Sequence, residues 1–437
     1  MEQSDKSLKR VLGFFPAVMI LVGTVIGAGI FMVPGTVASR AGSPGVDIAA
    51  WVIAGIAATL LALVYAELAP MLPKAGGSYI YIKEAYGDII AFLYGWAMII
   101  GSFIPVMALL AIAFTNYLSF FWPSITQTQA RSVGTILILI LCFANIRGVK
   151  LGALVQNIFT LGKLTALGLV IVVGIFTMKL VNFSPFIGPQ GWGTMANAAV
   201  PAILAFGGYY VLSYMSEEIE NPKRNLPLAM IVGMGIVIVV NVMINIVSIG
   251  NLEFGALAAS KKPLATVAQA IFGPIGGTIV SLGALISIFG SLNSSTMGLP
   301  RVAFSLSRDR LLFDFFATVH SKFGTPYIAI VVYSLIAIIF IWTGTFMSLL
   351  LMGIFVARLL ECLVAISLIV LRYRKPELER PLKMWGYPIT TLVAVLLTGY
   401  LVTKVDPPQM LRGAILMATS IPAYLLFKYV VPHRKES

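Results

Sequence analysis

The chain of 437 residues has few charged residues, few cysteines and few histidines, and each shortage excludes a class of protein. Charged residues make up 11% and apolar residues 59% of the chain, against roughly 25% and 45–50% in soluble globular proteins. Two cysteines, Cys142 and Cys362, are too few for a disulfide framework or a Cys-based metal site. The two histidines, His320 and His433, lie in polar connections, so we expect no His metal site and no cofactor.

Basic residues outnumber acidic residues by 30 to 17, which gives a net charge of +13. Such an excess can indicate a nucleic-acid partner. Here the basic residues lie in short connections between long apolar runs, where they report the orientation of a chain in a membrane. We therefore expect the lipid bilayer as a partner, and no nucleic acid.

Long apolar runs dominate the chain, and a bilayer core needs about 20 such residues in one helix. The pattern predicts twelve spans, at 12–38, 47–70, 89–119, 131–147, 150–178, 194–215, 227–250, 273–300, 326–343, 346–371, 386–403 and 410–431. The first run continues into a full span instead of ending at a small-residue cleavage site, so no cleavable signal peptide is expected.

The distribution of Lys and Arg over alternate connections predicts the orientation. With the N-terminus in the cytoplasm, 21 basic residues fall on the cytoplasmic side, 7 fall on the outer side and 2 lie inside spans. This split predicts that both termini are cytoplasmic and that the number of spans is even. We expect a multi-pass protein of a bacterial plasma (inner) membrane.

The first span contains three glycines within seven residues, Gly23, Gly27 and Gly29, followed by Pro34-Gly35. Each glycine weakens a helix by about 1 kcal/mol relative to alanine. One interpretation is a packing face of small residues from Gly23 to Gly27. The other is an interrupted helix, because non-helical backbone at this depth is tolerated where it is buried in protein or lines a cavity.

The sixth span contains a second candidate interruption at Gly207-Gly208, shortly after Pro201. Adjacent glycines break helices, and proline lacks the N–H group that the preceding turn needs. A simple proline kink is the alternative. The two candidate breaks lie at matching depths, about 15 residues into the first span and about 13 into the sixth.

Spans 1 and 6 would each begin a unit of five helices, and an odd number makes the second unit enter the membrane from the opposite side. Interrupted segments at corresponding positions of two inverted halves point to a transporter binding site. Half-helix N-termini suit a carboxylate, and freed carbonyl groups suit an ammonium group. Together they predict a site for the α-groups of an amino acid, with a small apolar pocket for its side chain.

Lys163 is the 14th residue of the 29-residue fifth span, so it lies near mid-depth. Each interface is roughly 15–20 Å away along the helix, too far for the side chain to reach. A cation there costs roughly 2.5–3.5 kcal/mol on insertion scales, so it must face the protein interior. Either Lys163 is structural, or its ammonium docks on the unwound backbone of span 1 and replaces a coupling sodium ion. The second hypothesis predicts sodium-independent transport.

Three further charged residues lie within or at the end of predicted spans. Arg358 and Glu361 lie three residues apart on one face of span 10, which favours an ion pair, with participation in gating as the alternative. Glu67 is expected to be interfacial at the cytoplasmic end of span 2.

The cytoplasmic end of span 6 carries Glu217 and Glu218, where the helix dipole disfavours acidic groups. They are either solvated or form an inner gate with a basic residue elsewhere. The stretch 73–88 is expected to be an amphipathic helix in the membrane interface, because it is rich in basic and aromatic residues.

Motifs in order along nearly the whole chain resemble the amino acid–polyamine–organocation (APC) superfamily, and most closely a prokaryotic member of its L-amino-acid transporter (LAT) family. The resemblance rests on several segments with specific residues: 23–31, Pro34-Gly35, 67–70, 73–79, Lys163, 206–208, 217–227 and 289–293. Together these motifs are highly specific, although any one of them alone is weak.

The resemblance implies an all-α polytopic membrane protein with 12 transmembrane helices, in a LeuT-type 5+5 inverted repeat with discontinuous helices 1 and 6. The chain would then divide into a cytoplasmic N-tail at 1–11, a first five-helix repeat at 12–180, an inverted second repeat at 181–373, and two further helices with a cytoplasmic C-tail at 374–437.

The resemblance also implies sodium-independent transport of small neutral L-amino acids, often by obligatory exchange. Carried over by motif, the substrate carboxylate meets the backbone around Gly27, Ala28 and Gly29. The amino group meets carbonyl groups in both interrupted spans. Lys163 matches the span-5 lysine of the family that contacts span 1. The remaining site residues implied by the motifs are Val25, Ile26, Leu204, Phe206, Gly207, Gly208 and Tyr209.

Four residues in three segments depart from the usual LAT pattern, and they surround the side-chain pocket. Ala28 stands where serine is frequent, Leu204 where an aromatic residue is frequent, and Tyr209-Tyr210 where Trp-Asn is common. The connection at about 120–130 contains no cysteine, so a disulfide-linked heavy-chain partner is not expected.

Three other functions are weighed against exchange. A proton- or sodium-coupled symporter on the same fold is the nearest alternative. A channel is disfavoured because no charge ring or repeated pore loop is present. An intramembrane enzyme needs a metal or a nucleophile with a base at mid-membrane, yet no histidine lies in a span and no Ser–Lys spacing stands out. We therefore expect a transporter and no enzyme.

Overall fold

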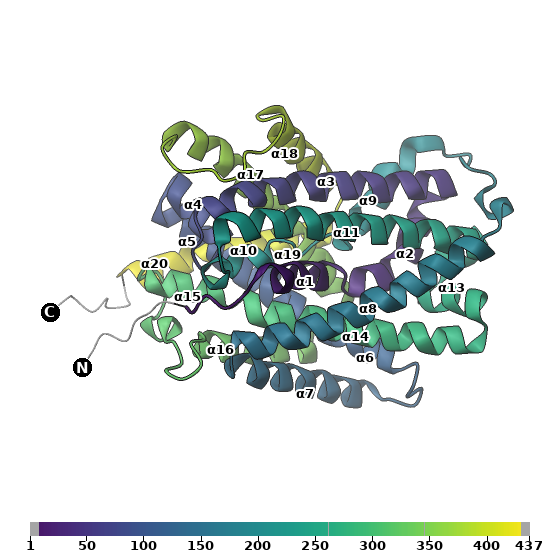
Figure 1. Ribbon diagram of the computed structural model, residues 1–437, viewed down its shortest axis with the longest axis horizontal. Coiled ribbons are helices and arrows are strands. Elements are labelled where there is room, and N and C mark those ends of the chain that lie inside the picture. The colour runs from purple at the N-terminus through teal and green to yellow at the C-terminus, as the bar shows by residue number, and fades with distance from the viewer. Residues whose placement is uncertain (1–7, 261, 345, 430–437) are drawn as a thin grey trace.

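The protein folds as a helical bundle in a computed structural model that describes residues 8–260, 262–344 and 346–429, apart from the side chains at 149–151, 204, 346–348, 350 and 351. In these ranges the β pairing is limited to an isolated bridge between Leu12 and Ile219. Most long helices run side by side along the longest axis (Figure 1). Residues 1–7 and 430–437 of the expected tails, with His433, lie outside the described residues.

The first half of the chain forms the helices that correspond to expected spans one to five. They are α1 (Phe14–Val25) with α2 (Ala28–Ala41), α3 (Pro44–Met71), α5 (Asp88–Met98) with the π-helical turn η1 (Ile99–Phe103) and α6 (Ile104–Leu118), α7 (Gln127–Ile146), and α8 (Val149–Thr177). All these ends lie within four residues of the predicted ones.

The second half begins with α9 (Met195–Leu204) and the short α10 (Val211–Tyr214). The helices that follow are α11 (Pro222–Asn251), α14 (Pro274–Gly298) with α15 (Arg301–Arg308), α16 (Tyr327–Thr343), α17 (Phe346–Arg374), α18 (Ile389–Val402), and α19 (Pro407–Ala418) with α20 (Ser420–Tyr429). Three short helices lie in connections: α4 (Ser78–Tyr86), α12 (Phe254–Ala259) and α13 (Pro263–Phe272).

Nine helical segments in the described part of the chain are long and apolar enough to cross a membrane. They confirm an all-helical polytopic membrane protein. The remaining three expected spans, 194–215, 326–343 and 386–403, correspond to α9 with α10, to α16 and to α18, which are shorter helices. The full count of twelve crossings therefore stays a prediction.

On α8 the exposed side chains are apolar and the buried side chains are polar, which is the reverse of the distribution in soluble proteins. Ile158 and Leu161 are 60% and 48% exposed, whereas Gln156, Thr160 and Lys163 are fully buried. An apolar outer face next to a polar inner face is typical of a helix that contacts lipid on one side and a polar protein interior on the other.

The helices α1 and α2 run through the middle of the bundle. Every residue of α1 from Ala17 to Val25 is buried. The helix α1 packs against α8, α11 and α14, and α2 packs against α9, α12 and α13. This arrangement encloses the expected interruption of span 1 in protein on all sides, with no exposure to lipid.

The stretch at 73–88 differs from the interfacial helix expected from its composition. Its helical residues are Ser78–Tyr86 and Asp88, which begins α5, and Ser78 to Ile82 are all buried. The aromatic side chains face the protein: Tyr65 and Tyr81 make an edge contact at 6.2 Å between ring centroids, and the Tyr79 hydroxyl donates to Asp309 at 2.6 Å. The aromatic residues therefore pack α4 onto the bundle and do not anchor it in lipid headgroups.

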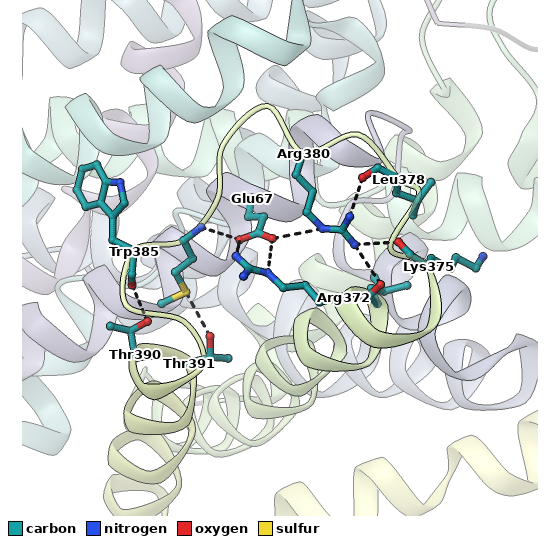
Figure 2. Close-up of polar contacts among 10 residues, drawn as sticks. Glu67, Arg372, Lys375, Leu378, Arg380, Trp385, Thr390 and Thr391 are labelled. Atoms are coloured by element: carbon teal, nitrogen blue, oxygen red, sulfur yellow. Dashed lines mark hydrogen bonds and ion pairs between the residues drawn. The ribbon is translucent and has the colours of Figure 1, made fainter.

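Glu67 lies one turn before the end of α3, and its side chain is completely buried in the protein. Arg372 donates to both of its carboxylate oxygens, at 2.8 and 2.6 Å, and the backbone N–H of Met384 donates at 2.7 Å. Figure 2 shows the side chains of Arg372 and Arg380 both pointing at this carboxylate, with Arg380 at 3.6 Å. The acidic group thus ties the end of α3 to the connection after α17.

Arg380 also supplies hydrogen-bond donors to carbonyl groups at the end of α17. Its guanidinium donates to the carbonyl oxygens of Leu371, Lys375 and Leu378 at 3.1, 2.9 and 2.7 Å (Figure 2). The last carbonyl groups of a helix have no partners within the helix, so a side chain that supplies donors stabilises the helix end. The connection between α17 and α18 is therefore folded back over this end of the bundle.

Candidate functional site

The helix of span 1 is interrupted at two residues, Ile26 and Gly27, between α1 and α2. The helix α2 begins without a side-chain cap, because Gly27 precedes it. The first N–H groups of a helix have no partner within the helix, and they carry partial positive charge. The start of α2 therefore presents unpaired donors in the middle of the bundle.

Close packing explains the glycines of this interruption. A Cβ atom on Gly29 would lie 2.8 Å from the Cα of Ala205, and one on Gly27 would lie 2.7 Å from Ser291 Oγ. Both distances are below 3.0 Å, closer than real Cβ atoms come to another heavy atom. The interruption of span 1 thus contacts the interruption of span 6 directly.

The buried ammonium group of Lys163 docks on the end of α1. Its Nζ donates to the carbonyl oxygens of Gly23 at 2.7 Å, Ile26 at 2.6 Å and Ser287 at 3.2 Å. The hydroxyl groups of Ser287 and Ser291 donate to the same two carbonyl oxygens of span 1, at 2.8 and 2.7 Å. A cation with three carbonyl partners thus holds the unwound backbone in place.

The helix of span 6 ends at Leu204 and resumes at Val211, with six non-helical turn residues between them. Gly208 has φ +110°, a conformation that residues with side chains rarely adopt, and its Cβ would lie 2.9 Å from the Thr24 side chain. The carbonyl oxygen of Ala205 accepts from the Asn241 amide at 2.9 Å. Both interruptions are therefore present and face each other.

A cavity of about 90 Å³ lies where the two interruptions meet. One water molecule needs roughly 10–15 Å³ on the same scale, so the space holds a small solute. Six of the residues expected at a substrate site line it: Val25, Gly27, Ala28, Gly29, Gly207 and Gly208.

Four of the expected site residues do not line this cavity. The carbonyl group of Ile26 is taken by Lys163 and Ser287. The ring of Phe206 lies against Trp51 at 6.0 Å, and the hydroxyl of Tyr209 donates to Glu361 at 3.1 Å. The fourth is Leu204, which ends α9 and whose side chain lies outside the described residues.

Other helices contribute lining residues that sequence patterns did not identify. Ser102 lies in the π-helical turn η1, and its hydroxyl is buried without a hydrogen-bond partner. A π turn inside an α-helix frequently marks a functional position. Ser295 of α14 also lines the cavity, as does Tyr210, which the comparison with the LAT pattern had already placed around the side-chain pocket. In the sequence, Ser102 could have been recognised only as a polar residue within an apolar span.

Arg358 brings a charge to the cavity wall. Its Nη1 donates to Glu361 Oε2 at 2.7 Å, and this contact is the ion pair that the spacing of the two residues predicts. The Tyr209 hydroxyl donates to the same oxygen. Arg358 Nε is buried and has no partner. The guanidinium and the carboxylate together leave this part of the wall formally neutral.

Glu217 and Glu218 each have an arginine partner on α15. Both carboxylate oxygens of Glu218 accept from Arg301, at 2.5 and 2.7 Å, and both side chains are 1% exposed. Glu217 accepts from Arg308 at 2.8 Å in a less buried pair. Burial raises the pKa of the Glu218 carboxyl, and the Arg301 guanidinium acts in the opposite direction. These pairs join the end of span 6 to the end of α14–α15.

The same region is closed by backbone contacts. The N–H groups of Val11 and Leu12 both donate to the carbonyl oxygen of Glu218, at 2.9 and 3.0 Å, and Glu220 N–H donates to Leu12 at 2.8 Å. The segment before α1 is therefore paired with the segment after α10. Together with the two arginine pairs, these contacts tie the segment before α1 and the end of span 6 to α15.

Comparison with known proteins decides the family. A family model described as an amino acid permease matches residues 12–427. The chain belongs to the amino acid permease family. Within the APC superfamily, this permease is similar to the Serine/threonine exchanger SteT of Bacillus subtilis (strain 168), at 31% identity over 405 residues that cover 90% of this chain and 91% of that protein.

Two animal transporters are similarly related to the permease. The mouse Large neutral amino acids transporter small subunit 2 is 32% identical over 438 residues, covering 97% of this chain and 82% of that protein. The human b(0,+)-type amino acid transporter 1 is 32% identical over 405 residues, covering 91% of this chain and 82% of that protein. The permease is thus a multi-pass membrane protein of amino-acid transport, of the APC superfamily and the LAT type, and its relatives are transporters and not enzymes.

Proposed function

We propose that the permease is a sodium-independent exchanger of small neutral L-amino acids that works by alternating access. The observation that carries the proposal is the cavity at which the start of α2 meets the non-helical segment 205–210. Unpaired N–H groups at Ala28 and Gly29 suit a carboxylate. Non-helical carbonyl groups of span 6 suit an ammonium group. Both charged ends of an amino acid find partners there.

A small, neutral substrate side chain fits the remaining walls. The cavity of about 90 Å³ is lined largely by apolar side chains of α6 and α17, including Val106, Leu109 and Ile354. The charge of Arg358 is balanced by Glu361 at 2.7 Å, so no net charge selects for an acidic or basic substrate. Ser102 and Ser295 offer hydroxyl groups to a polar side chain such as that of serine.

Lys163 supports independence from sodium. Its ammonium lies between span 1 and α14 and binds the carbonyl oxygens of Gly23 and Ile26. A coupling cation would need these same oxygens as ligands. A fixed cation there removes the need for a mobile one. The name of the bacterial relative, a serine/threonine exchanger, adds support for exchange of small neutral substrates.

The proposal includes the topology expected from the sequence. The chain would form twelve crossings in a LeuT-type arrangement, with a first repeat at 12–180, an inverted repeat at 181–373 and two final helices in 374–437. Its tails would face the cytoplasm of a bacterium. The pairs of Glu217 and Glu218 with α15 would then form a cytoplasmic gate, closed in this structure.

Counterflow in proteoliposomes tests the proposal. Vesicles that contain the purified permease are loaded with labelled serine, and release is followed with alanine, serine, leucine or arginine outside, without sodium. An exchanger of small neutral substrates releases label with alanine or serine outside and little with arginine. A symporter needs a proton or sodium gradient, a channel releases label into plain buffer, and an enzyme alters the label chemically.

A further inference from the structure

Asp47 is a completely buried carboxyl group that the proposed transport site does not use. It lies in the first turn of α3, with no exposed surface. Its Oδ1 accepts from the Asn245 amide of α11 at 3.2 Å, and its Oδ2 has no hydrogen-bond partner. The side chain makes no ion pair within the part of the chain that the structure describes.

The partner of Asp47 also has an unused atom. Asn245 Oδ1 is buried without a hydrogen-bond partner, so each side chain of the pair has one orphaned oxygen. Asp47 Oδ2 and Asn245 Oδ1 are thus both hydrogen-bond acceptors without a donor. A proton on Asp47 Oδ2 supplies that donor, because a carboxylic acid and a primary amide can form two mutual hydrogen bonds: the amide N–H to one acid oxygen and the acid O–H to the amide oxygen.

An ionised Asp47 would be poorly compensated. The start of α3 favours a negative charge by about 0.3–1 kcal/mol, whereas burying an uncompensated carboxylate costs several kcal/mol even after relaxation. A further candidate donor is the indole N–H of Trp51, one turn further along α3, which is buried and has no hydrogen-bond partner among the described residues. The cost of burial outweighs these gains.

Charged and titratable groups on the neighbouring helices do not offset the charge. On α2 the charged side chain is Arg40, which donates to the Asn197 carbonyl at 3.4 Å and forms no pair with Asp47. The helix α9 and the turn at 191–194 carry no titratable residue, and α18 carries only the exposed Tyr400. The charged residues of α11 and α17 are Lys223, Arg224, Arg358, Glu361, Arg372 and Arg374, and none of them is bonded to Asp47.

Two contacts connect Asp47 with the interruption of span 6. Asn241 lies one turn from Asn245 on α11, and its amide donates to the Ala205 carbonyl at 2.9 Å. Trp51 lies one turn from Asp47 on α3, and its ring contacts the ring of Phe206 at 6.0 Å between centroids. A change in the packing of α3 against α11 at Asp47 therefore reaches the non-helical segment that lines the cavity.

We propose that Asp47 is a proton-binding site, which holds one proton in an acid–amide pair with Asn245 and makes transport depend on pH through Asn241 and Trp51. Loss of the proton leaves the Asn245 amide oxygen without a donor and leaves a buried, poorly compensated carboxylate on Asp47. Transport then falls as pH rises. The transport part of this inference rests on the proposed amino-acid exchange, whereas the proton site itself does not.

Infrared difference spectroscopy of the purified full-length protein tests the proton site directly. The wild type is expected to show the C=O stretching band of a protonated carboxyl at neutral pH, and Asp47→Asn is expected to lack it. Asn245→Leu keeps the acid but removes its amide partner, so the band should shift in frequency. No difference between the wild type and either variant in this band would overturn the proposal, independently of any transport measurement.

Exchange in proteoliposomes at equal pH on both sides tests the consequence for transport. The side chain introduced by Asp47→Asn can form the same two hydrogen bonds with Asn245 and cannot titrate. We expect wild-type exchange to fall at least several-fold from mildly acidic to alkaline pH, and Asp47→Asn to stay nearly constant over that range. The swap Asp47→Asn with Asn245→Asp restores an acid–amide pair and should restore the pH dependence. Equal pH profiles of the wild type and Asp47→Asn would contradict the proposal.

Discussion

The ammonium nitrogen of Lys163 lies 2.6 Å from the carbonyl oxygen of Ile26, so that a side chain from the middle of α8 holds the interruption of span 1. Both groups are fully buried. A charge-assisted hydrogen bond in such surroundings is roughly twice as strong as a neutral one. The position of the unwound backbone therefore depends on a residue that does not line the cavity.

Replacement of Lys163 by methionine should impair exchange while the protein still folds. Methionine fills a similar volume but leaves the carbonyl oxygens of Gly23 and Ile26 with fewer donors, at a cost of roughly 1.5–3 kcal/mol per lost charged hydrogen bond. We expect counterflow to fall roughly 10–100-fold. The matched control is Thr165→Val, at an exposed position of the same helix. Wild-type rates for Lys163→Met would show that the contact does not support the site.

Replacement of Gly29 by alanine should separate the two interruptions. The added Cβ would lie 2.8 Å from the Cα of Ala205, which is backbone and cannot rotate away. We expect transport to be lost, since the cavity depends on this close approach. Gly168→Ala is the control, because nothing lies within 4 Å of its added Cβ. Binding of labelled serine to the purified variants measures the effect, and full binding by Gly29→Ala would contradict this explanation.

The pair of Glu218 and Arg301 should behave as one unit. Removing one member of a buried pair costs about 3–5 kcal/mol, because the other charge is left uncompensated. We expect Glu218→Arg and Arg301→Glu each to abolish exchange, and the double reversal to recover part of it. Arg308→Gln disrupts the more exposed pair with Glu217, worth about 1 kcal/mol or less, and should reduce exchange at most about fivefold. A double reversal as inactive as the single variants would exclude the pair as a gate.

Neutralising Glu361 should change substrate selectivity. In Glu361→Gln, the Tyr209 hydroxyl can still donate to the amide oxygen, but the charge of Arg358 on the cavity wall is no longer balanced. We expect acidic amino acids to compete with labelled serine at least several-fold better than in the wild type. Leucine competition serves as the control. An unchanged competition profile would mean that Arg358 does not reach the substrate.

The interruptions and the depth of Lys163 could be predicted because each is encoded locally. The glycines at 27, 29, 207 and 208 weaken a helix wherever it lies, and a lysine in the middle of a 29-residue span must find partners inside the protein. The ion pair of Arg358 with Glu361 was accessible for the same reason, since both residues share one helix face.

Contacts between distant helices could not be predicted in this way. The partner of Glu218 depends on the axial position of α15 relative to span 6, which no periodicity within either segment reveals. The same holds for the contact of buried Glu67 with Arg372, and for the position of Arg358 at the cavity wall. The mean composition of 73–88 suggested an interfacial helix, because it does not reveal that the aromatic side chains have partners inside the bundle.

Exchange through the two interrupted helices is tested by the release of labelled serine from proteoliposomes in sodium-free buffer, with and without unlabelled serine outside. We expect rapid release only when serine is outside, and no increase when sodium is added. Equally rapid release into substrate-free buffer, or release that requires sodium, would contradict a sodium-independent exchanger whose site is formed by the two interrupted helices.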